Sequence, residues 1–457
     1  MPPQEIIDII IDDIASTGDK ATLRACNSVS KSFRTRSKPH LFADIELVVD
    51  TRVRRSAGRL RSILKSEPEL VSGIRSFKMT VTDPFPFQSI VTGGVEEIGK
   101  VLWSRKIGNV ATVVGSMLGI LRSHLLWVLQ AIAQSAQVQK FSLGSSLYLN
   151  WDVLLIQSLL LTIRSNPRLH TLELENVCNL PIVMLTGNPN HASSLQHLIL
   201  KNSTVSRLEP TIFKSIVLPW TQLQTLTLIQ TPFFSYLARR QSYVLGKTFM
   251  NWIPHPLPLL SSLIIGPISS LDDIASISQL VTSGAQTITS LEIRIWERTT
   301  LSETFPLHDM VALQHLKFAT HADDIQDFEA RLLFIGDILR SAIAPMQLRS
   351  FTLEFALRFT IQWVTKLIVN PNSKGAPESP QNLFTNRWVP KAVRRAWGTL
   401  DEVLSSHRFP DLQQAFINLN LIRSEHDWIP VDIPNAANIL PKLSICQCVE
   451  VKLNVAV

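Results

Sequence analysis

The segment LHTLEL at residues 169–174 contains the pattern that decides the fold: an apolar residue followed by apolar residues three and five positions later. The same pattern returns as LQHLIL at 195–200 and LQTLTL at 223–228. The last three residues of each match would point alternately inward, outward and inward, as a short strand with one buried face requires. Seven further matches are Phe42-Ile45-Leu47, Ile74-Phe77-Met79, Val138-Phe141-Leu143, Leu260-Leu263-Ile265, Ile288-Leu291-Ile293, Leu313-Leu316-Phe318 and Leu348-Phe351-Leu353.

This repeat accounts for the composition, because 62 of the 457 residues are leucine. Successive matches start 25 to 37 residues apart, except for one interval of 64 between Ile74 and Val138. This spacing is typical of leucine-rich repeats. Helical patterns such as Trp151 to Ser165 lie between the matches, and a single strand-helix unit cannot bury its apolar face alone. The sequence therefore predicts an α/β fold over 42–457, an irregular solenoid with parallel strands on the concave side and helices on the convex side.

Two details of the repeat are also predicted. The interval of 64 predicts one degenerate unit near residue 106, and weaker matches at Leu412 and Leu443 predict two more units near the end. A polar stretch with three prolines, Asn370 to Pro380, predicts a loop or linker near 370–386. Trp388 to Ser406 is predicted to be a helix. The alternative to the solenoid is a set of ordinary buried strands in an α/β domain.

Residues 1–41 follow a helical period instead. Ile6, Ile10 and Ile14 are spaced to share one face of a helix, and a second helical pattern runs from Lys20 to Phe33. Pro39 is expected to end the helical region. Helices this short bury too little apolar surface to be stable alone, so they need the rest of the chain or a partner.

The N-terminal segment resembles an F-box. The matching residues are Pro3-x-Glu5-Ile6, Ile10, Ile14 and Leu23-x-x-Cys26-x-x-Val29-Ser30-Lys31-x-Phe33-Arg34, and they continue into His40-Leu41-Phe42. The resemblance implies docking on the Skp-type adaptor of an SCF ubiquitin ligase, and through it on a cullin. It departs from the family at Pro2, where a leucine is usual. The residues that it implies for the helical core and the adaptor-facing surface are Pro3, Ile6, Ile10, Leu23, Val29 and Phe33. The alternative is a generic helical cap on the larger fold.

Residues between the buried apolar positions of each strand are expected to face the concave side. They mix both charges with small hydroxyls, which suits a protein partner better than a phosphate backbone. The alternative is a solvated face without a ligand. His170, His197 and His315 are expected to be exposed or hydrogen-bonded rather than metal ligands. The candidate target-binding residues are Glu173, His197, Lys201, Thr227, Glu292, Arg294, His315, Lys317 and Glu354.

Charge and cysteine content narrow the class of protein. The net charge of +7 is concentrated in residues 51–110, which hold 11 Lys or Arg against 5 Asp or Glu. Apolar residues at helical spacing within this stretch favour a solvated helix face. Nucleic-acid binding by this stretch is a third hypothesis for the function of the protein. The basic residues are densest at Arg52, Arg54, Arg55, Arg59, Arg61 and Lys65.

Four cysteines are too few for a disulfide scaffold, and no signal peptide is visible. These two observations predict a cytoplasmic or nuclear protein.

Catalytic and cofactor motifs are missing from the sequence. It contains no phosphate-binding loop, no dinucleotide-binding glycine motif and no zinc-protease or nucleophile-elbow motif. The apolar stretch Val110 to Ala133 has Arg122 near its middle, so a buried helix is expected there instead of a membrane span. The sequence predicts no enzyme, no metal and no cofactor.

Together these patterns predict a substrate-recognition subunit of an SCF-type ubiquitin ligase. Residues 1–41 would dock on the adaptor, and residues 42–457 would bind an unidentified target protein. The alternative is a leucine-rich-repeat interaction scaffold with a degenerate F-box and no ligase role.

Overall fold

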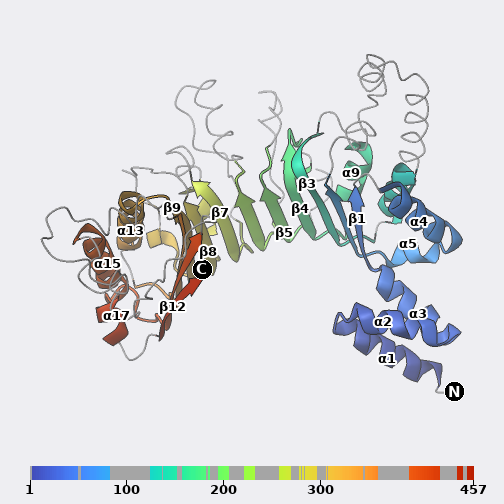
Figure 1. The fold of residues 1–457 in the computed structure, drawn as a ribbon, viewed down its shortest axis with the longest axis horizontal. Coiled ribbons are helices and arrows are strands. Elements are labelled where there is room, and N and C mark those ends of the chain that lie inside the picture. Colours follow the sequence, from blue (N-terminus) through green and yellow to red (C-terminus); the bar gives the residue numbers. More distant parts are fainter. Residues whose placement is uncertain are drawn as a thin grey trace, which may run out of the picture. The chain divides into compact units, whose positions relative to one another are not determined.

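The structure is a computed structural model of the chain. It describes residues 3–49, 53–82, 124–135, 137–151, 157–181, 184–185, 194–204, 221–231, 257–268, 277–278, 280–282, 284–295, 305, 307–342, 345–358, 391–422, 440–445 and 450–456. Within these ranges the fold is α/β, with twelve parallel strands whose order in the sheet is their order in the chain, β1 to β12 (Figure 1). The chain divides into two compact units, Met1–Leu223 and Gln224–Val457.

Unit 1 contains β1 to β5, and each strand is parallel to the next. The first residues of these strands lie side by side in register, so the apolar residues of successive motifs stack into one core. α4 packs against β1. The strands are β1 (Asp44–Val49), β2 (Ser76–Val81), β3 (Lys140–Asn150), β4 (Thr171–Cys178) and β5 (His197–Lys201), and the helices after the N-terminal region are α4 (Val53–Ser66), α5 (Glu69–Gly73) and α9 (Gln157–Arg164).

Unit 2 repeats this arrangement with β6 to β12. α13 packs against β9 and against α15, and α17 packs against α15. The strands are β6 (Thr225–Ile229), β7 (Ser262–Ile268), β8 (Ser290–Ile295), β9 (His315–Ala322), β10 (Ser350–Arg358), β11 (Gln414–Ile422) and β12 (Glu450–Ala456). The helices are α13 (Ile325–Arg340), α15 (Lys391–Leu404), α17 (Pro441–Ile445) and the 3-10 turn η3 (Leu307–Asp309).

Each of the ten motif matches places a strand where it was expected. Of two finer predictions about the repeat, the degenerate unit near residue 106 lies outside the described residues, and the unit at Leu443 is misplaced. β2 pairs directly with β3, so no strand from the interval near residue 106 lies between them in the sheet. Leu443 lies in α17, and the last strand begins at Glu450, opposite Gln414. A period counted along the chain cannot distinguish a missing unit from a long connection, whereas strand pairing can.

Left-handed backbone conformations recur at one position of the repeat, within β4 and directly after β5 and β6. Asn176, Asn202 and Gln230 each follow the last apolar residue of a motif by two positions and have left-handed backbones, with φ of 57°, 50° and 51°. Asparagine tolerates this conformation better than most residues. Gly266 has φ of +146°, and a Cβ there would lie 2.3 Å from Arg294 Cβ, so no other residue fits without a backbone shift.

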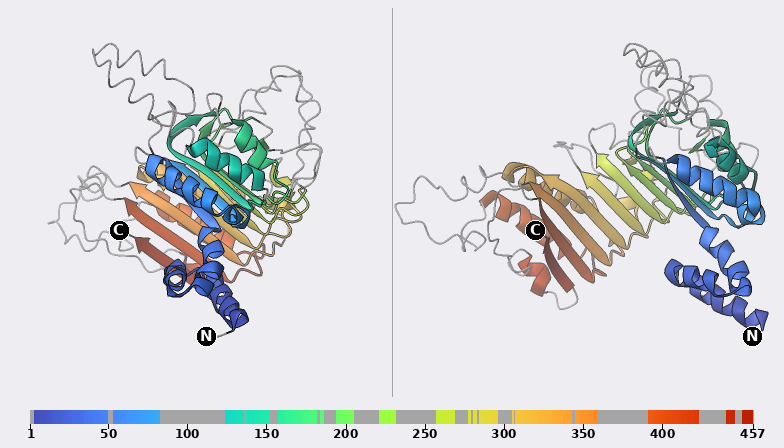
Figure 2. Two further views of the ribbon diagram at one scale, coloured as in Figure 1. Left: turned by 90° about the vertical axis from the view of Figure 1, so that its right-hand side faces the viewer. Right: turned by 45° about the vertical axis from the view of Figure 1, so that its right-hand side comes forward.

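Three helices precede the sheet: α1 (Gln4–Ser16), α2 (Lys20–Val29) and α3 (Lys31–Phe42). They form a separate cluster that joins the sheet at β1 (Figure 2). Ser30 separates α2 from α3 because its backbone is extended, and its hydroxyl accepts a hydrogen bond from the Phe33 amide at 3.4 Å. Pro39 does not end the helix, contrary to expectation. α3 continues to Phe42, because its contacts with α5 and β1 offset the one backbone hydrogen bond that proline removes.

Several predictions fall partly or wholly outside the described residues. The linker near 370–386 lies outside them, as do Arg52 and residues 110–123; the side chains of Arg54 and Arg55 are also not described. Residues 124–133 are helical, with Leu125, Val128 and Leu129 buried. In the part of the chain that the structure describes, no helix combines the length and apolar character that a bilayer crossing needs.

Candidate functional site

The helical cluster α1–α3 has a small core of its own. Ile7, Ile11 and Leu23 are buried, and the residues that pack against them include Ile14 and Phe33. The core side of α1 is therefore the Ile7–Ile11–Ile14 side, whereas Ile6 and Ile10, which the spacing places on one helix face with Ile14, are exposed. The run of isoleucines at 6, 7, 9, 10 and 11 offers apolar residues on nearly every side of the helix, so spacing alone did not identify which side is buried.

The other side of α1 exposes apolar residues. Ile6, Ile9 and Ile10 are 46%, 64% and 42% exposed, and their spacing places them on adjacent turns of one helix face. We call these three residues the isoleucine face. Val29, at the end of α2, is 66% exposed. Of the six residues that the F-box resemblance implies, Leu23 and Phe33 support the core, whereas Pro3, Ile6, Ile10 and Val29 are exposed. Ile9 was not predicted.

Asp12 joins the first helix of the cluster to the third. Its carboxylate accepts hydrogen bonds from Arg36 Nε at 2.9 Å and from Arg36 Nη2, and its Oδ1 lies 2.8 Å from His40 Nε2. The hydrogen bond from Arg36 holds the pKa of Asp12 below its ordinary value, and His40 adds to this effect. The sequence indicated that Asp12 lies on a polar face of the first helix. It did not indicate the partners of Asp12, Arg36 and His40, which lie 24 and 28 residues further along the chain.

Lowering the pH is expected to weaken the helical cluster through Asp12. Because its pKa is lower in the folded state, its contribution to stability is complete above the ordinary value of 3.8 and is lost as the pH falls through the folded value. Hydrogen exchange of α1 and α3 amides, measured below pH 5 in the wild type and in Asp12→Asn, checks this. The variant should show a smaller change with pH, and equal changes in both proteins would contradict the assigned role.

The polar sheet face of unit 1, on which the predicted residues lie, contains paired charges. Lys201 Nζ lies 2.9 Å from Glu173 Oε1, and Ser142 donates a hydrogen bond to Glu173 Oε2 at 3.1 Å. Burial raises the pKa of Glu173, but the contacts with Lys201 and Ser142 outweigh it, so the net pKa lies below the ordinary value. Burial and the neighbouring His170 lower the pKa of His197.

On the corresponding face of unit 2, ion pairs connect the side chains of three neighbouring strands. Lys317 on β9 lies 2.7 Å from Glu354 on β10 and 3.6 Å from Glu292 on β8, and Arg294 lies 2.8 Å from Glu292. The structure therefore brings four predicted residues together as mutually neutralising pairs. The other two predicted residues of this unit are not part of these pairs. His315 is exposed. Thr227, opposite Ile264, is only 6% exposed, so the prediction that it is accessible to a target is wrong.

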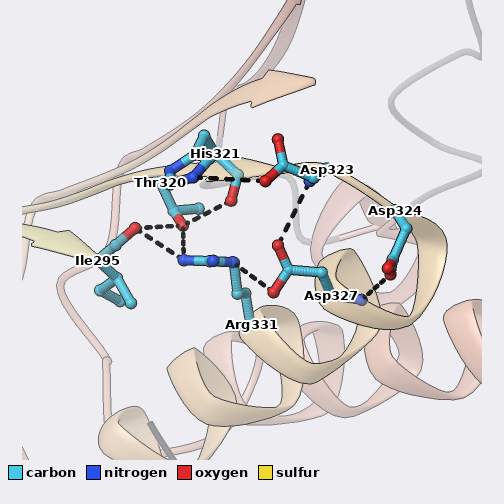
Figure 3. Close-up of polar contacts among 7 residues, drawn as sticks. All are labelled: Ile295, Thr320, His321, Asp323, Asp324, Asp327 and Arg331. Carbon is cyan, nitrogen blue, oxygen red and sulfur yellow. Dashed lines mark hydrogen bonds and ion pairs between the residues drawn. The ribbon is translucent and has the colours of Figure 1, made fainter. Parts of the chain in front are cut away.

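A buried polar cluster at the junction of β8, β9 and α13 was missed by sequence reasoning. Arg331 Nε lies 3.0 Å from Asp327 Oδ1, and Arg331 Nη1 donates to the Ile295 carbonyl at 2.9 Å and to the Thr320 hydroxyl at 3.1 Å (Figure 3). Asp327 and Arg331 are 3% and 4% exposed. Since the Asp327 carboxylate and the Arg331 guanidinium both have partners within the protein, the cluster fits a role in holding the two strands and the helix together.

Basic side chains at two further places also contact other parts of the protein instead of solvent alone. Arg164 is buried, donates to the Met184 and Leu185 carbonyls at 2.7 and 3.0 Å, and has its pKa lowered by burial to about 10. In the basic stretch of α4, Arg59 is exposed as predicted, but Lys65 Nζ and Arg61 Cζ lie 5.5 and 6.0 Å from the centre of the Trp127 ring. Part of this stretch is therefore held by an aromatic ring, which favours a structural role for it.

Neither a scan of protein-family models nor a search of curated proteins finds a match to this sequence. No group of three or more His, Cys, Asp or Glu residues within the described ranges could hold a metal ion. The candidate sites are therefore the exposed apolar residues of the helical cluster, which are the isoleucine face and Val29, and the polar face of the sheet.

Proposed function

We propose that this chain is a substrate-recognition subunit of an SCF-type ubiquitin ligase, in which an F-box-like α1–α3 docks on a Skp-type adaptor. The observation that carries the proposal is the division of apolar residues in this cluster. Ile7, Ile11 and Leu23 fill the core, while Ile6, Ile9, Ile10 and Val29 remain in solvent. Exposed apolar residues gathered on a small helical cluster favour a protein interface.

The sheet supports the second half of the proposal, an irregular leucine-rich-repeat solenoid that holds a target protein. The strands are parallel and follow chain order, and ten of the twelve described strands begin within a match of the same short motif. Motif repetition with this topology is what stacked strand-helix units produce. The polar face then offers charged and hydroxyl groups at regular spacing, which suits a protein surface.

Such a subunit needs no catalytic residues of its own. Holding a target near the ubiquitin donor raises the effective concentration of the target lysine, so transfer accelerates through geometry alone. The parts required are one surface for the adaptor and one for the target.

Co-expression with a Skp-type adaptor tests the docking surface. The variant Ile10→Asp with Val29→Asp places two charges on that surface without touching the core, so co-purification of the adaptor should fall at least tenfold. The matched control is Leu259→Asp with Val311→Asp, which alters two apolar residues of similar exposure in unit 2 and should leave binding unchanged. An unchanged pull-down with the first variant contradicts the docking surface. Failure of the wild type to bind indicates the interaction scaffold without a ligase role.

A further inference from the structure

One carboxylate on the polar face of unit 1 differs from the others. Asp44 lies 3.5 Å from Lys20, Glu46 lies 2.8 Å from Lys78 and Glu173 lies 2.9 Å from Lys201, all measured between nitrogen and oxygen atoms. Glu175, on β4, is exposed and forms no ion pair or hydrogen bond with any residue that the structure describes. Lys201 lies opposite Glu175 in the register, but its ammonium group is directed to Glu173.

Glu175 lies beside a strand position that has no side chain. Its strand neighbour is Gly144 on β3, and a Cβ built there would lie 3.6 Å from Glu175 Oε2, so the carboxylate leans over a position without a side chain. Thr80 on β2 is the next residue in the same row, and its hydroxyl is buried without a hydrogen-bond partner. Thr80, Gly144 and Glu175 thus form a row across three neighbouring strands, in which the carboxylate of Glu175 is the accessible polar group.

The strand that carries Gly144 also has a bulge. The register of β3 against β4 shifts between Gly144 and Leu149, and Tyr148 within this interval is 62% exposed. Bulges are common beside functional sites, and exposed tyrosines are enriched in protein interfaces. This is a second observation, independent of the charge on Glu175, that marks the end of β3 as a contact region.

Unit 2 shows how a cation is held on this kind of face. There Lys317 lies between carboxylates from the two flanking strands, at 2.7 and 3.6 Å. Among the described residues no cation forms an ion pair with Glu175; Lys78 attracts it electrostatically but is itself paired with Glu46. A charge-assisted hydrogen bond from an external Lys or Arg would complete the same arrangement.

Building on the proposed function, we infer that Glu175 is the docking point for a Lys or Arg side chain of the bound target protein. The basic group approaches the exposed end of Glu175 from outside and donates a hydrogen bond to its carboxylate. Tyr148 contributes aromatic contact area at the same end of β3. This assigns a charge preference to target recognition that neither the repeat pattern nor the F-box resemblance contains.

Selection from a phage-displayed library of random 12-residue peptides on the full-length chain tests the inference. Peptides selected by the wild type should be enriched at least fivefold in Lys or Arg at one aligned position. Glu175→Gln should abolish this enrichment, and Glu175→Lys should replace it with Asp or Glu. Gly144→Leu, which places a side chain in front of the carboxylate, should also abolish it.

Glu46→Gln is the matched control, because Glu46 is exposed on the same face of unit 1 but is already paired with Lys78. It should retain the preference for a basic residue. A preference that survives Glu175→Gln, or selection without any Lys or Arg position, overturns the inference. Thermal melts of each variant show that it is folded. Because the adaptor binds α1–α3, its co-purification with Glu175→Gln distinguishes failure here from failure of the proposed function.

Discussion

Replacing Arg331 with alanine is expected to lower the free energy of unfolding of unit 2 by about 3–5 kcal/mol, because it leaves the Asp327 carboxylate buried without its cation. The same change removes the donor to the Ile295 carbonyl and the Thr320 hydroxyl. Three elements, β8, β9 and α13, lose their common contact, so the effect should extend beyond the helix. Hydrogen exchange of amides in β8 and β9 measures it.

The control for Arg331→Ala is Arg340→Ala on the same helix. Arg340 lies 2.8 Å from Asp337, but both side chains are largely exposed, so this pair should contribute less than about 1 kcal/mol. Equal effects of the two substitutions would show that burial of the Asp327 pair is not what stabilises the junction.

Ile11→Ala is expected to destabilise the helical cluster by about 2–5 kcal/mol, since a fully buried aliphatic side chain is truncated in a core of few residues. A cluster this small has little stability in reserve, so protection of α1–α3 amides against hydrogen exchange should largely disappear. Adaptor binding should weaken with it.

Ile9→Ala separates the core from the docking surface. Ile9 is two residues from Ile11 in the same helix but is mostly exposed, so its removal should change stability by less than about 0.5 kcal/mol. Its effect should appear in adaptor affinity instead. If Ile9→Ala destabilised the cluster as much as Ile11→Ala, the buried side of α1 would be assigned wrongly.

Much of the strand placement could be predicted from the sequence, because the signal is local. Each motif, such as Leu169-Leu172-Leu174, contains the alternation of a strand and lies within six residues. Connections between motifs carry no comparable signal. The interval of 64 before Val138 therefore suggested a hidden unit, and only the structure shows that β2 pairs directly with β3. Leu443 was misplaced for the same reason, since an isolated leucine suits a helix or a strand equally.

The candidate sites were less predictable, because they depend on partners far apart in the chain. The charged residues of the polar face could be found by counting positions, but not which of them neutralise one another. Arg331 and the Ile295 carbonyl are 36 residues apart, and nothing local connects them. The unpaired state of Glu175 is visible only once Lys201 is seen to contact Glu173.

By itself, the sequence determined the parallel strand-helix repeat and the distinct helical cluster at the N-terminus, because periodicity is a property of neighbouring residues. Only the tertiary structure decided which side of α1 is buried, which strands are adjacent and which charges are paired. These depend on the free energy of packing and on Coulomb interactions between segments that the chain brings together from tens of residues apart. Such interactions decide that Ile11 is buried and Ile10 is not. They also decide that Lys201 pairs with Glu173 and not with Glu175.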